Sequence, residues 1–154
     1  RLDATLSERS VSSTIILDKK IAFNHSRKDG IRKARKNSLR IEKSIDYAGF
    51  WPVLEANLQD RHSAKPVHSL LEMQHLASLF PDNIVLYLVI TSCSEIAAGT
   101  VLYINNNIVH VQYISSTKEG KSLGALDFMF DFLINDVYRD YRIFDFGTSC
   151  LGCY

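Results

Sequence analysis

A histidine on an alternating strand is the side chain of this sequence best suited to proton transfer. In the segment IVHVQYIS, residues 108–115, strand alternation places His110 and Gln112 on one face and Tyr113 on the other. An imidazole titrates near neutral pH, which suits general acid–base catalysis. A structural histidine with a satisfied hydrogen bond would show the same pattern, so both roles remain open for His110.

Asp145 is a second candidate, because its strand sets a carboxylate beside apolar residues. In IFDFG, residues 143–147, alternation places Asp145 on the face opposite Phe144 and Phe146. A buried carboxylate requires a hydrogen-bond partner. Asp145 is therefore expected to bond a nearby backbone or basic group, or to contact a substrate together with Ser149 in the following turn.

The polar connection RHSAKPVH, residues 61–68, carries Arg61, His62 and His68. Loops held between rigid helices frequently carry function. The two histidines lie six residues apart with no two further ligands nearby, which is a poor pattern for zinc. We therefore favour acceptor binding over metal binding for these three residues, and no metal is expected.

The most uneven distribution of charge lies in HSRKDGIRKARKNSLRIEK, residues 25–43. This segment has eight Lys or Arg and two acidic residues, a charge of +6, whereas the other 135 residues carry ten basic and fifteen acidic residues, a charge of −5. Acidic residues are scarce nearby, so the surplus would attract a phosphate-rich partner, with Arg32 and Arg35 as candidate contacts. The alternative is a solvated helix face, and interleaved aromatics for base reading are lacking.

Length and composition indicate one globular domain. The chain has 154 residues, of which 46% are hydrophobic and 23% charged, with a net charge of +1. A chain of this size can bury about 70% of its unfolded surface without disulfides. The balance excludes histone-like basic proteins, acidic tails and disordered linkers.

Cysteine usage and hydropathy predict a cytoplasmic protein. The chain has three cysteines, an odd number that favours a reducing compartment. It contains neither a signal peptide nor an apolar run of membrane-spanning length. Cys150 and Cys153 form a CxxC, but a redox pair needs a following helix and zinc needs two more ligands, so neither is expected.

Hydrophobic periodicity predicts a mixed α+β fold that must position these side chains. The helices are expected at residues 26–37, 46–60, 69–79 and 123–138. The strands are expected at residues 15–17, 39–45, 84–91, 96–104, 108–115 and 143–147. Residues 84–115 form an antiparallel meander, a polar loop follows at 116–122, and the last strand is parallel to its predecessor through a right-handed crossover.

Seven strings of residues in a fixed order resemble the GNAT acyltransferase superfamily, in the branch related to the FemAB peptidyltransferases. They are GIRKARKN (30–37), FWPVLEANLQDRH (50–62), PVHS (66–69), AAGTVLY (97–103), VHVQYISS (109–116), GKSLGALD (120–127) and FDFGTS (144–149). The resemblance covers residues 20–149. It implies a GNAT-like sheet and the transfer of an acyl group, acetyl foremost, from acyl-CoA to an amine on a sugar, peptide or cell-envelope precursor.

The resemblance also implies roles for individual residues. GNAT enzymes bind the donor pyrophosphate on a loop of the pattern Arg/Gln-x-x-Gly-x-Gly/Ala, where backbone N–H groups at a helix start attract phosphate. Residues 121–126 match this pattern with Lys first and Leu last. The donor contacts implied are Ser115, Ser116, Lys121, Ser122, Gly124 and Ala125. The catalytic residues implied are His110, Gln112 and Tyr113. The candidate acceptor contacts, which come from the segments described above, are Arg32, Arg35, Arg61, His62, His68, Asp145 and Ser149.

Two further functions stay open for this domain. Residues 1–20 are expected to form an arm with the first strand, and residues 21–154 the GNAT-like domain, truncated because relatives continue with two more strands. One alternative is a FemAB-like transferase that uses aminoacyl-tRNA and binds tRNA through the basic segment. The other is a non-catalytic module or oligomer that pairs through an exposed sheet edge.

Overall fold

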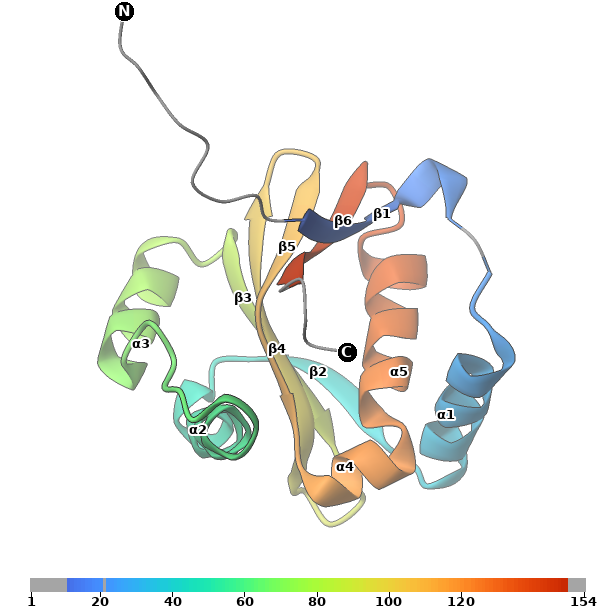
Figure 1. The fold of residues 1–154 in the computed structure, drawn as a ribbon, viewed down its shortest axis with the longest axis horizontal. Coiled ribbons are helices and arrows are strands. Elements are labelled where there is room, and N and C mark those ends of the chain that lie inside the picture. Colours follow the sequence, from blue (N-terminus) through green and yellow to red (C-terminus); the bar gives the residue numbers. More distant parts are fainter. Residues whose placement is uncertain (1–10, 21, 150–154) are drawn as a thin grey trace, which may run out of the picture.

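The computed structural model describes residues 11–20 and 22–149, which form one mixed sheet with helices on both faces (Figure 1). The strands are β1 Val11–Ile16, β2 Arg40–Ser44, β3 Ile84–Ile90, β4 Ile96–Asn105, β5 Ile108–Ser116 and β6 Ile143–Ser149. The helices are η1 Leu17–Lys19, α1 His25–Lys36, α2 Tyr47–His62, α3 Leu70–Leu79, α4 Lys118–Leu123, α5 Ala125–Phe132 and η2 Leu133–Val137. The predicted mixed α+β class is confirmed.

The strand order is β1-β6-β5-β4-β3-β2, and β5 and β6 are the parallel pair. The strands from β3 to β5 form the predicted antiparallel meander. The long apolar runs of β3 and β4 are buried because helices cover both faces of the sheet centre. β1 pairs antiparallel with β6 on the side away from β5, so this strand belongs to the same sheet.

Two apolar cores lie on opposite faces of the sheet. The α5-face core packs α1 and α5 against the sheet and includes Ala34, Met129 and Phe144. The α2-face core packs α2 and α3 against the other face and includes Phe50 and Met73. Figure 1 shows α2 and α3 on one side of the sheet and α1 and α5 on the other.

Local signals in the sequence explain where the helices begin. Asp46 caps α2 by accepting a hydrogen bond from the Gly49 N–H, as its residue type predicts. Ser69 and Glu72 form a capping box at the start of α3. The α1 helix turns Ile31 and Ala34 into the core.

β5 and β6 separate soon after they begin to pair. Their parallel register joins Ile108 to Ile143, Val109 to Phe144 and His110 to Asp145. Beyond these three pairs β5 continues to Ser116 and β6 to Ser149, with no further register between them. The two strands therefore diverge and open a V in the sheet.

A β-bulge in β5 corrects the predicted alternation of that strand. Leu102 of β4 pairs with Val111, but its neighbour Val101 pairs with Tyr113, so Gln112 is an extra residue. Val111 joins the α5-face core, whereas Tyr113 joins the α2-face core. The sequence placed these two residues on the same face, which is wrong because the bulge shifts the period by one residue.

Three other segments differ from the expected elements. The polar loop predicted at residues 116–122 is largely helix α4, capped by Thr117. The crossover helix turns into the π-helical η2 at Leu133. The predicted N-terminal arm contributes residues 11–13 to β1, and its remainder lies outside the described residues.

A glycine holds α4 close to the edge of β4. Gly120 is buried, and a Cβ atom there would overlap the carbonyl oxygen and carbon of Ala97. The Thr117 N–H also donates to the Ala97 oxygen, over 2.9 Å. The first turn of α4 is therefore fixed against the backbone of β4.

We expect Gly120→Ala to lower the free energy of unfolding by about 1–3 kcal/mol, because overpacking against rigid backbone outweighs the better helix propensity of alanine. Urea unfolding measures the change. The exposed α1 substitution Lys33→Ala serves as a control and should shift stability by less than about 0.5 kcal/mol. Unchanged or higher stability of Gly120→Ala would contradict the close contact.

Candidate functional site

Two cavities meet at the open end of the V. The larger, about 500 Å³, lies between α2 and α4, and the smaller, about 260 Å³, lies beside the end of β5. Both are lined by Asn57, Arg61 and Ser116. The smaller one is also lined by Ile114 and Leu126, which belong to the α5 side of the sheet. It is therefore a passage between the two faces.

The larger cavity is basic. Arg61, Lys118 and Lys121 line it together with a single acidic side chain, Asp60. Basic groups in a concave site concentrate anions. The structure thus brings together Arg61, Ser116 and Lys121, which the sequence had assigned to two different ligands. Lys118 was not identified from the sequence, because only the fold of α4 turns it toward the same cavity.

Asn57 ties α2 to the end of β5. Its side-chain amide donates to the Ser115 hydroxyl over 2.7 Å, to the Ser116 carbonyl over 2.8 Å and to the Val53 carbonyl over 3.0 Å. The Ser115 hydroxyl in turn donates to the Val53 carbonyl over 2.9 Å. Ser115 is 4% exposed and Ser116 8%. The Ser115 hydroxyl is therefore engaged in holding the wall of the site.

The other expected donor contacts lie at the junction of α4 and α5. The Ser122 hydroxyl donates to the Glu119 carbonyl over 2.8 Å. Gly124 adopts a left-handed conformation, φ +74°, that lets its Cα approach the backbone of Gly30. Ala125 is fully buried. The expected loop is therefore a helix–helix corner that packs against α1.

His110 and Asp145 form a hydrogen-bonded pair at the point where the strands diverge. His110 Nδ1 lies 2.8 Å from Asp145 Oδ2, and Asp145 Oδ1 accepts a hydrogen bond from the Gly147 N–H over 3.0 Å. A carboxylate only accepts, so Nδ1 carries the hydrogen and Nε2 is left able to take a proton. The His110 side chain is 35% exposed and that of Asp145 20%. The pair can therefore act on a bound group.

Tyr113 links the strand to the connection between α2 and α3. Its hydroxyl accepts from the His68 backbone N–H over 3.2 Å and lies 2.8 Å from His68 Nδ1. Because that backbone N–H points at the oxygen, the phenol hydrogen is available to Nδ1. The Trp51 and His68 rings also meet Tyr113 edge to face, at 5.6 and 6.0 Å. Tyr113 is 8% exposed, so its ring belongs to the core while its hydroxyl contacts His68.

Tyr103 joins these groups and was missed by sequence reasoning. It is the cross-strand partner of His110 on β4 and packs against the α2-face core. Burial, and then the nearby Tyr113, raise the pKa of its phenol. The hydroxyl therefore stays protonated and can donate a hydrogen bond. Only the register between β4 and β5 could have identified it.

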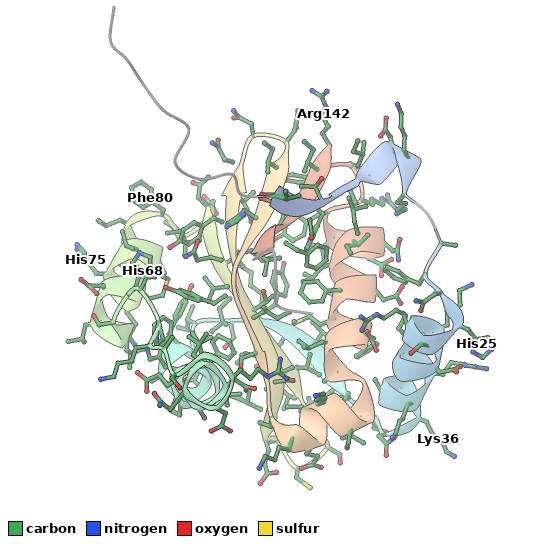
Figure 2. The ribbon with its side chains drawn as sticks, in the orientation of Figure 1. His25, Lys36, His68, His75, Phe80 and Arg142 are labelled. Carbon is green, nitrogen blue, oxygen red and sulfur yellow. The ribbon has the colours of Figure 1, made fainter. Side chains whose placement is uncertain are left out.

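The basic helix α1 lies on the other face of the sheet. Figure 2 shows His25 and Lys36 at the ends of α1, across the sheet from His68. Arg27 pairs with Asp127 at 2.7 Å and Arg35 with Asp131 at 3.0 Å, while Arg32 pairs with Asp29. The sequence predicted few acidic partners for this segment, because it did not reveal the carboxylates that α5 supplies. Binding of tRNA by this helix stays a prediction.

The expected site is thus divided between two faces. Arg32 and Arg35 line a cavity of about 540 Å³ beside α1 and α5 and do not meet His110. His62 ends α2 and Ser149 ends β6, but the side chains of both lie outside the described residues. The CxxC at residues 150–153 lies outside them as well. The Gln112 side chain is half-buried at the bulge.

Neither a metal-binding group nor a membrane-spanning helix occurs among the described residues. Among residues 11–20 and 22–149, no three His, Cys, Asp or Glu side chains come together in a way that could hold a metal ion. In the same ranges, none of the helices is both long enough and apolar enough to cross a membrane.

Comparison with known proteins rests on structure. No family model and no curated protein matches the chain. FemX matches 90% of this chain and 52% of its own, with a TM-score of 0.73 at 12% identity. L-PGS from Bacillus licheniformis matches 93% of this chain and 48% of its own, with a TM-score of 0.66 at 12% identity. A protein from Clostridium difficile 630, described as a possible acetyltransferase, matches 63% of this chain and 69% of its own, with a TM-score of 0.53 at 11% identity.

The fold is GNAT-like. At these identities the matches establish the fold of the chain but not its reaction. The chain spans about half the length of FemX and L-PGS. In the GNAT-like sheet of this chain, β5 and β6 are in register only up to His110 and Asp145, and the two cavities lie further along β5, beside Ser116.

We expect Asn57→Ala to lower the free energy of unfolding by about 1–3 kcal/mol, because it removes the bonds that join α2 to the end of β5 and leaves buried acceptors unpaired. Urea unfolding gives the value. Glu55→Ala, on an exposed position of the same helix, is the matched control and should stay within about 0.5 kcal/mol of the parent chain. Equal effects of the two substitutions would argue against the role of Asn57.

Proposed function

We propose that this chain is an N-acyltransferase that moves an acyl group from acyl-CoA to an amine on a sugar, peptide or cell-envelope precursor. The observation that carries the proposal is the V between β5 and β6. We infer that this V forms the path from the basic cavity beside the end of β5 to the His110–Asp145 pair, the last residues at which the two strands are in register. An acyl transfer needs these parts: an anion site for the donor, a gap for the thioester and a base for the amine.

The donor phosphates are assigned to the larger cavity. Arg61, Lys118 and Lys121 provide cationic groups there, and Asn57 holds the wall in place. This assignment differs from the loop that the resemblance implied, because the turn around Gly124 is packed against α1. The side chains of α2 and α4 replace the backbone N–H groups of that loop as the phosphate ligands.

The base is assigned to His110. Asp145 orients the ring through Nδ1, which leaves Nε2 to take the proton from the attacking ammonium group. The amine then forms a bond to the thioester carbon, the C–S bond breaks, and the leaving thiolate takes up the second proton that the nitrogen releases as the amide forms. Beyond His110, the backbone N–H groups on the edge of β5 that faces β6 make no ladder bonds with β6. They are suitably placed to stabilise the carbonyl oxyanion.

The acceptor amine is assigned to the α2 face of the sheet. His110, Asp145, Tyr103 and the Tyr113–His68 pair all lie on this face, beside the closed end of the V. Their hydroxyl and imidazole groups can hydrogen-bond the polar groups of a sugar or peptide. The FemAB resemblance suggests a cell-envelope precursor among such acceptors.

Donor binding is tested by titrating acetyl-CoA and longer acyl-CoAs into the full chain by isothermal calorimetry. The double substitution Lys118→Ala/Lys121→Ala removes two phosphate ligands and should weaken binding about 10- to 100-fold. Lys33→Ala with Lys36→Ala removes the same charge from α1 and should change binding less than about threefold. The proposal fails if no acyl-CoA binds the parent chain.

The catalytic assignment is tested by single-turnover transfer to a panel of amino sugars and peptides. We expect His110→Ala to lower the rate about 10²- to 10⁴-fold, because the proton acceptor is lost. Asp145→Asn should lower the rate less, while both variants bind donor as the parent does. An unchanged rate in His110→Ala would exclude this histidine as the base.

A further inference from the structure

We propose that the acyl chain of the donor is a medium or long hydrocarbon chain, held in an apolar cavity on the α5 face of the sheet. This inference rests on the proposed acyltransferase function and specifies its substrate class. The cavity has a volume of about 350 Å³. Its apolar lining includes Ile15, Phe23, Ile114, Leu126, Phe130 and Phe146.

The cavity is continuous with the passage between the strands. Ile114 and Leu126 line both the 350 Å³ cavity and the 260 Å³ cavity at the end of β5. The latter shares Asn57, Arg61 and Ser116 with the basic cavity. A donor with its phosphates at Lys118 and its arm in the V therefore points its acyl end toward the apolar cavity.

The lining is aromatic and partly open. The rings of Phe130 and Phe146, which both line the cavity, lie 5.0 Å apart at their centroids. Ile114 is 42% exposed although it points to the α5 face of the sheet. Ile114 lies on β5 beyond the point where β5 and β6 diverge, and a hydrocarbon chain would cover its exposed surface.

The polar groups at the cavity neutralise each other. Arg27 and Asp127 line it and form an ion pair of 2.7 Å, with Asp127 19% exposed. No surplus charge is thus available for an anionic head, and the cavity suits an uncharged chain. Its volume lies within the range of about 300–1,000 Å³ that small-molecule sites show, whereas an acetyl group would leave most of it empty.

The test is a chain-length series on the full chain, with CoA, acetyl-CoA, hexanoyl-CoA and decanoyl-CoA compared by isothermal calorimetry. Each buried methylene should tighten binding roughly two- to fourfold. We therefore expect decanoyl-CoA to bind at least about 30-fold more tightly than acetyl-CoA. Equal affinity across the series overturns the inference and leaves the acyltransferase proposal intact.

Two neighbouring positions of β1 provide a matched pair of variants. Ile15 lines the cavity, whereas Ile16 is 48% exposed. Ile15→Trp should fill the cavity and reduce the preference for decanoyl-CoA to below about threefold, with acetyl-CoA affinity unchanged. Ile16→Trp should keep the full preference. Phe23→Trp, in the segment between η1 and α1, replaces Ile15→Trp if thermal melting shows that the latter does not fold.

A separate probe distinguishes this inference from the proposed function. If no CoA ester binds, the acyltransferase proposal fails, and the cavity is then tested with cis-parinaric acid, a fluorescent fatty acid. Fluorescence that rises with the parent chain and with Ile16→Trp, but not with Ile15→Trp, would retain the cavity as an acyl-chain site. An absence of signal with the parent chain would overturn it.

Discussion

The short parallel pairing of β5 and β6 is the constraint on which the rest of the structure depends. A parallel pair needs a crossover, so α4, α5 and η2 must pack on one face and return the chain beside β5. The pairing stops after His110 and Asp145, so the two strands bring a base and a carboxylate together and then separate. A longer pairing would close the passage, and a shorter one would lose the contact between the two side chains.

The basic residues of the chain are divided between the two faces of the sheet. The +6 segment is partly neutralised by Asp127 and Asp131 of α5, so much of its charge serves to hold α1 against α5. Such ion pairs on a surface stabilise by about 1 kcal/mol or less, and the apolar contacts of Ile31 and Ala34 contribute more. The smaller group of cations around Lys118 and Lys121 has one acidic neighbour in its cavity and is the better anion site.

The sequence allowed the architecture to be predicted, because hydrophobic periods and capping residues are local signals. Asp46 marked the start of α2, and the apolar runs from β3 to β5 marked the meander. The bulge at Gln112 has no such marker, so Tyr113 was assigned to the wrong face. The pairing of His110 with Asp145 joins residues that are 35 positions apart in the sequence. The contribution of Lys118 to the basic cavity depends on how α4 packs against the sheet. Both are products of tertiary packing that a local pattern does not record.

The separation of the two faces has a chemical consequence for an acyl transfer. A base that removes a proton from an amine could equally remove one from water, and hydrolysis would then compete with transfer. His110 lies on the α2 face, while the apolar cavity and its Phe130 and Phe146 rings lie on the α5 face. A chain bound among these rings would displace water from the open side of the V, leaving the thioester accessible only from the face of His110. Under this arrangement the bound acyl chain itself helps to exclude water, so transfer to the amine is favoured over hydrolysis.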